Sequence, residues 1–260
     1  MNDNKYLRLP NSNCEIIEHP NGTDNAIDIG LVKDHRFVFY FWFKWWKKTK
    51  RKLEENILKA PALITIDWHR DLCAPCDIEK QDLINLNLNS YKEVAYFSWD
   101  KLNPLNDGHI LSAVYLNLIG DVYVLCKQDG SDDGTFTDHW GNEHKIICFE
   151  SKEELLEKLL KDSINEIYFD IDLDYFTESE DSCGGGEDLT LMNDKDILSL
   201  LDINSEFMQW VFERMEGMTI ATEPKWCGGL KNSNKLYNLV DNTLFNFQLF
   251  SKNATWKHLS

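Results

Sequence analysis

The sequence predicts an α/β protein with three layers, in which helices cover both faces of a mainly parallel sheet. Short apolar runs typical of buried strands alternate with stretches whose apolar residues have helical spacing, and this alternation is the pattern of a parallel sheet. Hydrophobic residues make up 43% of the 260 residues and aromatic residues 12%, so the chain can bury a large core. No internal repeat or linker divides it, and we expect a single domain over residues 1–260.

The strands are predicted from the apolar runs and the residues that interrupt them. Residues 1–25 are polar and contain Pro10, Pro20 and Gly22, so we expect an irregular segment with room for one short strand near 14–17. The strand candidates that follow are residues 26–32, 63–66, 94–97, 122–125, 146–149, 167–169 and 218–221.

Helices are predicted between several of these strands. Ser151 and Glu154 form a capping box at the start of a helix whose leucines continue at helical spacing to Leu160. A second helix is expected over residues 205–215, with Gly217 as its stop, and a third over 235–249.

Residues 37–46 are almost all aromatic or apolar and are followed by a basic run, 47–52. The apolar part has roughly half of the ~20 residues that a membrane span needs. Its aromatic side chains would cover most sides of a helix, so we predict a deeply buried helix whose end emerges at Lys47. A helix lying in a membrane interface and a docking surface for a peptide are the alternatives.

Charge and cysteine content indicate the kind of partner and compartment. The formal net charge of −17 disfavours nucleic acid, whose phosphates need a basic surface, and suits a cationic partner better. The seven cysteines are an odd number with no secretory leader before them, so we expect reduced thiols in a cytoplasmic protein with no membrane partner. Cys73 and Cys76 form a lone C-x-x-C, whereas zinc usually requires a second pair of ligands.

Two acidic motifs follow directly on predicted strands. They consist of Asp67, His69 and Asp71 in one case and of Asp170, Asp172 and Asp174 in the other. Alternate residues share a face while the chain stays extended, and ligands of open α/β sheets bind beyond the carboxyl ends of the strands. Ligand-type side chains crowded into one crevice would repel each other without cations, so we interpret the motifs as two halves of one metal site. The alternative is that these acids cap local backbone.

Oxygen and imidazole ligands without thiolate suit manganese better than structural zinc. So many carboxylates favour two ions, which together lower the pKa of bound water from ~15.7 towards ~7. Asp34, His35 and Glu223 also follow predicted strands and belong to the same expected crevice.

These motifs resemble those of a known superfamily. Residues 66–71 resemble the D-x-H-x-D motif of the arginase-like ureohydrolases, and residues 168–172 resemble their second metal motif. Asp34 and His35 resemble the end of the G-G-D-H segment that supplies another histidine ligand. The resemblance implies two Mn²⁺ ions, one held by His35, Asp67, Asp71 and Asp170 and the other by Asp67, His69, Asp170 and Asp172.

The resemblance also implies catalytic residues. His109 lies about where ureohydrolases keep a proton-shuttling histidine, and Glu223 ends a segment like the one whose glutamate binds the substrate guanidinium. Asp174 is an additional acid without a counterpart in the arginase pattern. It is expected to act as a proton relay, or to replace Asp170 so that Asp172 and Asp174 form the metal pair.

Departures from the arginase pattern point to a larger substrate. Cys73 stands where enzymes of free arginine carry an asparagine that holds the amino acid, and the serine-rich pattern before His109 is absent. With these departures, and with the sequences D-x-H-R-D and D-I-D-L-D-Y-F in its two metal motifs, the chain resembles the peptide arginases. That family converts arginine side chains of ribosomally made precursor peptides to ornithine and urea, with a metal-bridging hydroxide as nucleophile. An arginine-containing precursor peptide is therefore the expected partner, drawn in by the acidic, glycine-rich segment 177–188 acting as a mobile loop.

Other functions compete with this one. A deacetylase or other amidohydrolase of the same superfold would hold one zinc ion and act on acetylated amines. A non-catalytic binder of basic peptides would use the acidic clusters without releasing urea. A sugar-nucleotide transferase could use Asp170 and Asp172 as its metal motif, but it leaves the first motif without a role. The sequence leaves the native metal and the oligomeric state open.

Overall fold

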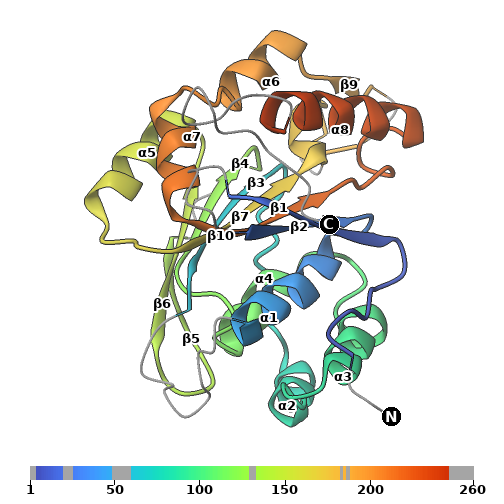
Figure 1. Ribbon diagram of the computed structural model, residues 1–260, viewed down its shortest axis with the longest axis vertical. Coiled ribbons are helices and arrows are strands. Elements are labelled where there is room, and N and C mark those ends of the chain that lie inside the picture. The colour runs from blue at the N-terminus through green and yellow to red at the C-terminus, as the bar shows by residue number, and fades with distance from the viewer. Residues whose placement is uncertain are drawn as a thin grey trace.

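The protein is described by a computed structural model that covers residues 4–19, 26–48, 60–128, 133–181, 184–185 and 188–245. Its centre is an eight-stranded sheet with the strand order β1-β2-β10-β7-β3-β4-β6-β5. The six inner strands run parallel, whereas β1 and β5 pair antiparallel at the two edges. Helices α1 to α4 cover one face and α5 to α8 cover the other (Figure 1). The predicted three-layer α/β architecture with a mainly parallel sheet is confirmed.

The strands of the large sheet are β1 (Ser12–Glu18), β2 (Ala26–Val32), β3 (Ala62–Asp67), β4 (Val122–Cys126), β5 (Gly134–Thr137), β6 (Glu143–Phe149), β7 (Ile167–Asp172) and β10 (Met215–Ala221). A separate two-stranded ribbon joins β8 (Thr177–Glu178) to β9 (Thr190–Leu191). The helices are α1 (Val38–Lys48), α2 (Asp77–Asn85), α3 (Tyr91–Tyr96), α4 (His109–Tyr115), α5 (Lys152–Lys161), α6 (Asp194–Leu200), α7 (Glu206–Arg214) and α8 (Leu230–Leu244).

Two hydrophobic cores lie on opposite faces of the sheet. One contains the aromatic side chains of α1 together with residues of α4, and the other contains the apolar sides of α5, α7 and α8. Strand β7 is buried along its whole length, with Tyr168 in the first core and Phe169 and Ile171 in the second. Because successive side chains alternate between faces, Asp170 and Asp172 lie on the same side as Tyr168, towards α1.

Helix α1 is buried on nearly all sides, as the aromatic run predicted. Trp45 packs on Tyr168 of β7, with 5.3 Å between ring centroids. Two glycines make room for the helix: a Cβ at Gly30 would lie 2.7 Å from the Phe41 ring, and one at Gly217 would lie 2.5 Å from the Trp45 ring. The bare backbone of β2 and β10 therefore lets α1 lie close to the sheet. Residues 49–52 of the basic run lie outside the described residues.

Three predicted elements differ from those observed. Residues 94–97, predicted as a strand, belong to α3 and to a π-helical turn (Phe97–Lys101). The reason is a helix cap, because the side chain of Ser90 accepts a hydrogen bond from the Glu93 backbone N–H. Gly217 does not end a helix but lies inside β10, since α7 ends at Arg214 and the strand begins at the next residue. The last helix begins at Leu230 rather than near residue 235.

The N-terminal segment is more ordered than predicted, because residues 12–18 form the complete edge strand β1. Cys73 and Cys76 are exposed, and Cys126 and Cys227 are buried. None of the helices in the described ranges combines the length and apolar composition that crossing a bilayer requires.

Replacing Gly217 tests the close packing of α1 on the sheet. We expect Gly217→Ala to lower the free energy of unfolding by about 1–3 kcal/mol, because the new methyl group overlaps the buried Trp45 ring. Denaturant unfolding measures the change, and Gly134→Ala on the exposed edge strand β5 is the control. Adding Trp45→Leu should recover part of the loss; equal stability of Gly217→Ala and the unchanged protein would contradict this packing.

Candidate metal centre

Acidic and histidine side chains gather where four neighbouring parallel strands end. His35 begins a 3₁₀ turn (His35–Phe37) shortly after β2, and Asp67 and Asp172 are the last residues of β3 and β7. Asp174 lies in a 3₁₀ turn (Leu173–Phe176) after β7, and Glu223 lies just past β10. Because β2, β10, β7 and β3 are adjacent in the sheet, their carboxyl ends bring these side chains together as predicted.

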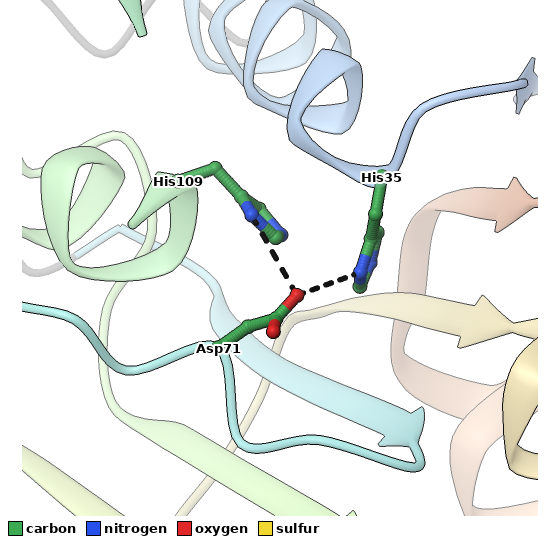
Figure 2. Close-up of side chains that lie close together, drawn as sticks. All are labelled: His35, Asp71 and His109. Atoms are coloured by element: carbon green, nitrogen blue, oxygen red, sulfur yellow. Dashed lines mark hydrogen bonds and ion pairs between the residues drawn. The ribbon is translucent and has the colours of Figure 1, made fainter. Parts of the chain in front are cut away.

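The imidazole of His35 lies at the centre of the group. Its Nδ1 is 3.0 Å from Asp71 Oδ2, 3.1 Å from Asp172 Oδ2 and 3.3 Å from Asp67 Oδ2. One N–H can form a good hydrogen bond with only one of three such oxygens, and His35 with Asp67 and Asp172 is close enough to hold a cation between its ligand atoms. Figure 2 shows the rings of His35 and His109 both directed at the carboxylate of Asp71.

Asp170 lies behind His35. Its carboxylate accepts hydrogen bonds from Thr65 and Thr219 on the two flanking strands, and its Oδ2 is 2.8 Å from His35 Nε2. A carboxylate in this position fixes the orientation of an imidazole whose other nitrogen faces a metal. Asp170 is also absent from the described groups of side chains that could hold an ion, although the sequence predicted it as a bridging ligand.

Asp174 occupies the second half of the site. The chain does not stay extended past Asp172, because the Asp172 carboxylate accepts a hydrogen bond from the Asp174 backbone N–H and starts the 3₁₀ turn. The turn places Asp174 Oδ2 3.1 Å from His69 Nδ1, and Asp67 Oδ1 is 3.8 Å from the same nitrogen. Asp67, His69 and Asp174 therefore form a second ligand group beside the one at His35.

These residues fit two divalent ions. The described groups are His35 with Asp67 and Asp172, Asp67 with His69 and Asp174, His35 with Asp71 and His109, and Asp172 with Asp174 and Glu223. Within the described chain, Asp67 Oδ2 and Asp174 Oδ2 are buried without any hydrogen bond, a costly state that a cation would relieve. All donors are oxygen or imidazole nitrogen, which suits manganese and similar ions.

Burial of so many acids together shifts their protonation. Burial and neighbouring carboxylates raise the pKa of Asp71, Asp172 and Asp174 above the usual range. Burial alone would lower the pKa of His35, but the Asp170 and Asp172 carboxylates raise it well above its usual value. Some of these carboxyl groups therefore hold protons, and a bound cation would displace those protons.

His109 is held in one orientation by the chain before it. It is fully buried at the start of α4, and its Nδ1 lies 3.0 Å from the Asn106 carbonyl oxygen. Burial and the nearby charge of His35 hold the pKa of His109 well below its usual value, so the ring is neutral. Donation from Nδ1 to the carbonyl leaves Nε2, which has no hydrogen bond to any described residue, as a proton acceptor.

Glu223 is anchored by hydrogen bonds from two other segments. Its Oε1 accepts from the His35 backbone N–H at 2.8 Å and from the Asn106 side chain. Burial raises the pKa of Glu223 to about 7, even though the charge of nearby His35 opposes this shift. Asp71, Asn106 and Glu223 all have positive φ angles, at 52°, 64° and 28°. Such strain at non-glycine residues is concentrated at functional sites.

A cavity of about 430 Å³ opens beside this cluster. Its lining includes Asp71, Asp172 and Glu223 from the cluster, together with Asn106 and Trp226. The Trp226 ring meets the His69 ring edge-on at 5.4 Å. Neither Asn106 nor Trp226 belongs to the site residues predicted from the sequence, although the Asn-Asp-Gly order at 106–108 is typical of a tight turn and is a local signal for the first.

Comparisons with known proteins add a structural likeness. A scan against models of protein families and a search of curated proteins each found no match. The chain is similar in structure to the crystal structure of Helicobacter pylori arginase, with a TM-score of 0.42 and 14% sequence identity. The alignment covers 82% of this chain and 72% of that one. The ligand groups described above depend on the side chains of this chain alone.

Metal content of single variants tests which acids are ligands. We expect Asp174→Ala to bind one divalent ion fewer per chain than the unchanged protein, because it removes a ligand-type side chain of the His69 half. Asp170→Asn should keep both ions with affinity weakened about 10–100-fold, since it acts through His35. Elemental analysis after dialysis and calorimetric titration measure these effects, with exposed Asp82→Ala as the control. Loss of an ion in Asp170→Asn together with full loading of Asp174→Ala would reverse the assignment.

Proposed function

We propose that the protein is a metal-dependent hydrolase of the arginase type, which converts arginine side chains of a precursor peptide to ornithine and urea. The observation that supports this most directly is a buried cluster of acids and histidines that shares one cavity with a further carboxylate, Glu223. The cluster has the ligands for cations, and the separate carboxylate suits the guanidinium of a substrate.

Two divalent ions, proposed to be manganese, would be held by His35, Asp67, Asp71, Asp172, His69 and Asp174. When bound, such ions lower the pKa of water towards ~7 and so supply a nucleophile at neutral pH. Asp170 keeps the His35 ring in place from behind.

Glu223 binds and orients the substrate guanidinium. His35 and Asn106 hold its carboxylate at the wall of the cavity, so a guanidinium entering there meets a fixed acceptor. A cation at this position favours the charged form of Glu223, which burial alone disfavours. The resulting ion pair places the guanidinium carbon next to the cluster.

Proton transfer accompanies the bond changes. Water adds to the guanidinium carbon, and the bond from that carbon to the side-chain nitrogen then breaks as this nitrogen takes up a proton, giving ornithine and urea. The proton that leaves the attacking water passes to the departing nitrogen by way of Asp174, whose Oδ2 lies 3.1 Å from His69 Nδ1 at the same cluster. His109, neutral and with a free Nε2, takes up and returns a proton during turnover.

A peptide substrate is supported by the surroundings of the cavity. The exposed Cys73 at its rim offers no amide group to hold the end of a free amino acid. The described acids of segment 177–188 (Glu178, Glu180, Asp181 and Asp188) are exposed and attract a cationic chain. Free arginine is the second candidate, because Arg70 also lines the cavity and suits a carboxylate.

Urea release distinguishes the candidate substrates. With manganese we expect urea and ornithine from arginine-containing peptides, and turnover of free arginine lower by at least about tenfold in kcat/KM. A colorimetric urea assay and mass spectrometry of the peptide measure the two products. Faster turnover of free arginine would assign the second candidate, and release of acetate from acetylated peptides without any urea would favour a deacetylase.

Substituting Glu223 tests guanidinium binding separately from metal binding. We expect Glu223→Gln to keep the metal content of the unchanged protein but to lower kcat/KM for the arginine peptide by about 100-fold or more, because the charge-assisted contact is lost. The control is Glu216→Gln, an exposed residue of the same strand. Unchanged kinetics of Glu223→Gln would remove this residue from the reaction.

A further inference from the structure

A second cavity, of about 310 Å³, lies beside the edge strand β1 and carries the opposite charge to the metal centre. Its nine lining residues include four basic ones, Lys5, Arg8, Lys44 and Lys48, and a single acid, Asp28. We call it the basic cavity. In a chain with 44 acidic and 27 basic residues, such a local excess of cations is opposite to the overall charge.

Three of these cations have no carboxylate partner among the described residues. Lys48 lies 3.4 Å from Asp28, but no ion pair found among the described residues involves Lys5, Arg8 or Lys44. Arg8 donates to Asn13, a neutral acceptor. The ammonium group of Lys44 lies over the rings of Tyr40 and Phe41. The positive charge of the basic cavity is therefore available to an incoming anion.

The basic side chains share the cavity with a cysteine and with apolar and aromatic residues. Cys14 is half-buried and lines the cavity together with Arg8, Lys44 and Lys48. The lining also contains apolar and aromatic side chains, among them Tyr6, 73% exposed, and Ile16, 44% exposed. An occupant that matches these walls has apolar groups as well as negative charge.

The strand beside the basic cavity has an open edge. β1 is the last strand of the sheet and pairs only with β2 within the described part of the chain. Cys14 and Ile16 alternate along β1 and both line the cavity. An exposed strand edge presents backbone N–H and C=O groups to which an extended peptide can pair.

We propose that the basic cavity binds an acidic peptide segment, which pairs with the edge of β1 and places its carboxylates among Lys5, Arg8 and Lys44. Alternate side chains of an added strand point to one face, so every second residue of the segment reaches the cavity. A small anion such as phosphate would match the cations but not the apolar walls or the strand edge. This binding does not depend on the reaction proposed for the metal centre.

Fluorescence anisotropy with defined peptides tests the proposal on the full chain. The probe is a labelled decapeptide of alternating glutamate and valine, and the comparison peptide has glutamine in place of glutamate. We expect the glutamate peptide to bind at least about tenfold more tightly, and its affinity to fall as salt rises. Equal binding of both peptides, or no binding of the glutamate peptide, would overturn the proposal.

Variants locate the binding. Lys44→Glu should weaken binding of the glutamate peptide by about tenfold or more, because it reverses a charge in the cavity wall. Lys231→Glu, the same change at an exposed site on α8 across the sheet, should alter the affinity less than about twofold. Equal thermal unfolding of both variants and the unchanged protein checks the fold. Equal weakening by the two substitutions would mean binding by overall charge and would contradict a site at β1.

Two competitors separate strand pairing from anion binding. A glutamate peptide N-methylated at alternate residues keeps its carboxylates but loses backbone donors, and we expect binding weaker by about tenfold. Pyrophosphate at the same concentration should displace little of the labelled peptide. Undiminished binding of the N-methylated peptide, or full displacement by pyrophosphate, would show a site for small anions and overturn the peptide assignment.

Discussion

The burial of several carboxylates at the ends of neighbouring strands is the constraint on which the rest of the site depends. Asp67, Asp71, Asp172 and Asp174 repel one another in a region that water barely reaches, and two of their oxygens have no hydrogen bond in the described chain. Such a cluster is stable only with compensating positive charge. The surrounding structure supplies fixed positions for that charge, because Thr65 and Thr219 donate hydrogen bonds to Asp170, whose carboxylate in turn holds the ring of His35 from one side.

Much of the fold could be predicted, because apolar runs and caps are local signals. The strand ends that carry the site followed directly from buried runs before Asp67 and Asp170. Two predictions were wrong, one because it missed a local helix cap and the other because the conformation depends on a contact with a residue distant in the sequence. The Ser90 cap turns an apolar run into a helix, and the same kind of motif had been recognised at Ser151. Gly217 was interpreted as a helix stop, but its role depends on Trp45, far away in the sequence.

The sequence predicted which residues lie at the site better than it predicted what each of them does there. Spacing alone could place Asp170, Asp172 and Asp174 together, but it could not show which of them faces the cluster. Two features outside the motif decide this. Hydroxyl groups of the flanking strands donate hydrogen bonds to the carboxylate of Asp170, and a turn brings Asp174 next to His69. Asn106 reaches the site through a left-handed turn and contacts Glu223 across 117 positions, a relation that no local pattern encodes.

The burial of α1 has a consequence for how ions enter and leave. His35 lies directly before this helix, whose aromatic side chains are enclosed by the sheet and by α3 and α4. His35 therefore cannot move outward unless the packing of the layer formed by α1 to α4 is disrupted. The loops that line the 430 Å³ cavity, with Asp71 and Asn106 in left-handed conformations, form the wall on the other side of the cluster. An ion that binds at the cluster would therefore reach it from the side of the 430 Å³ cavity, which Asp71, Asp172 and Glu223 line, while His35 closes the opposite side.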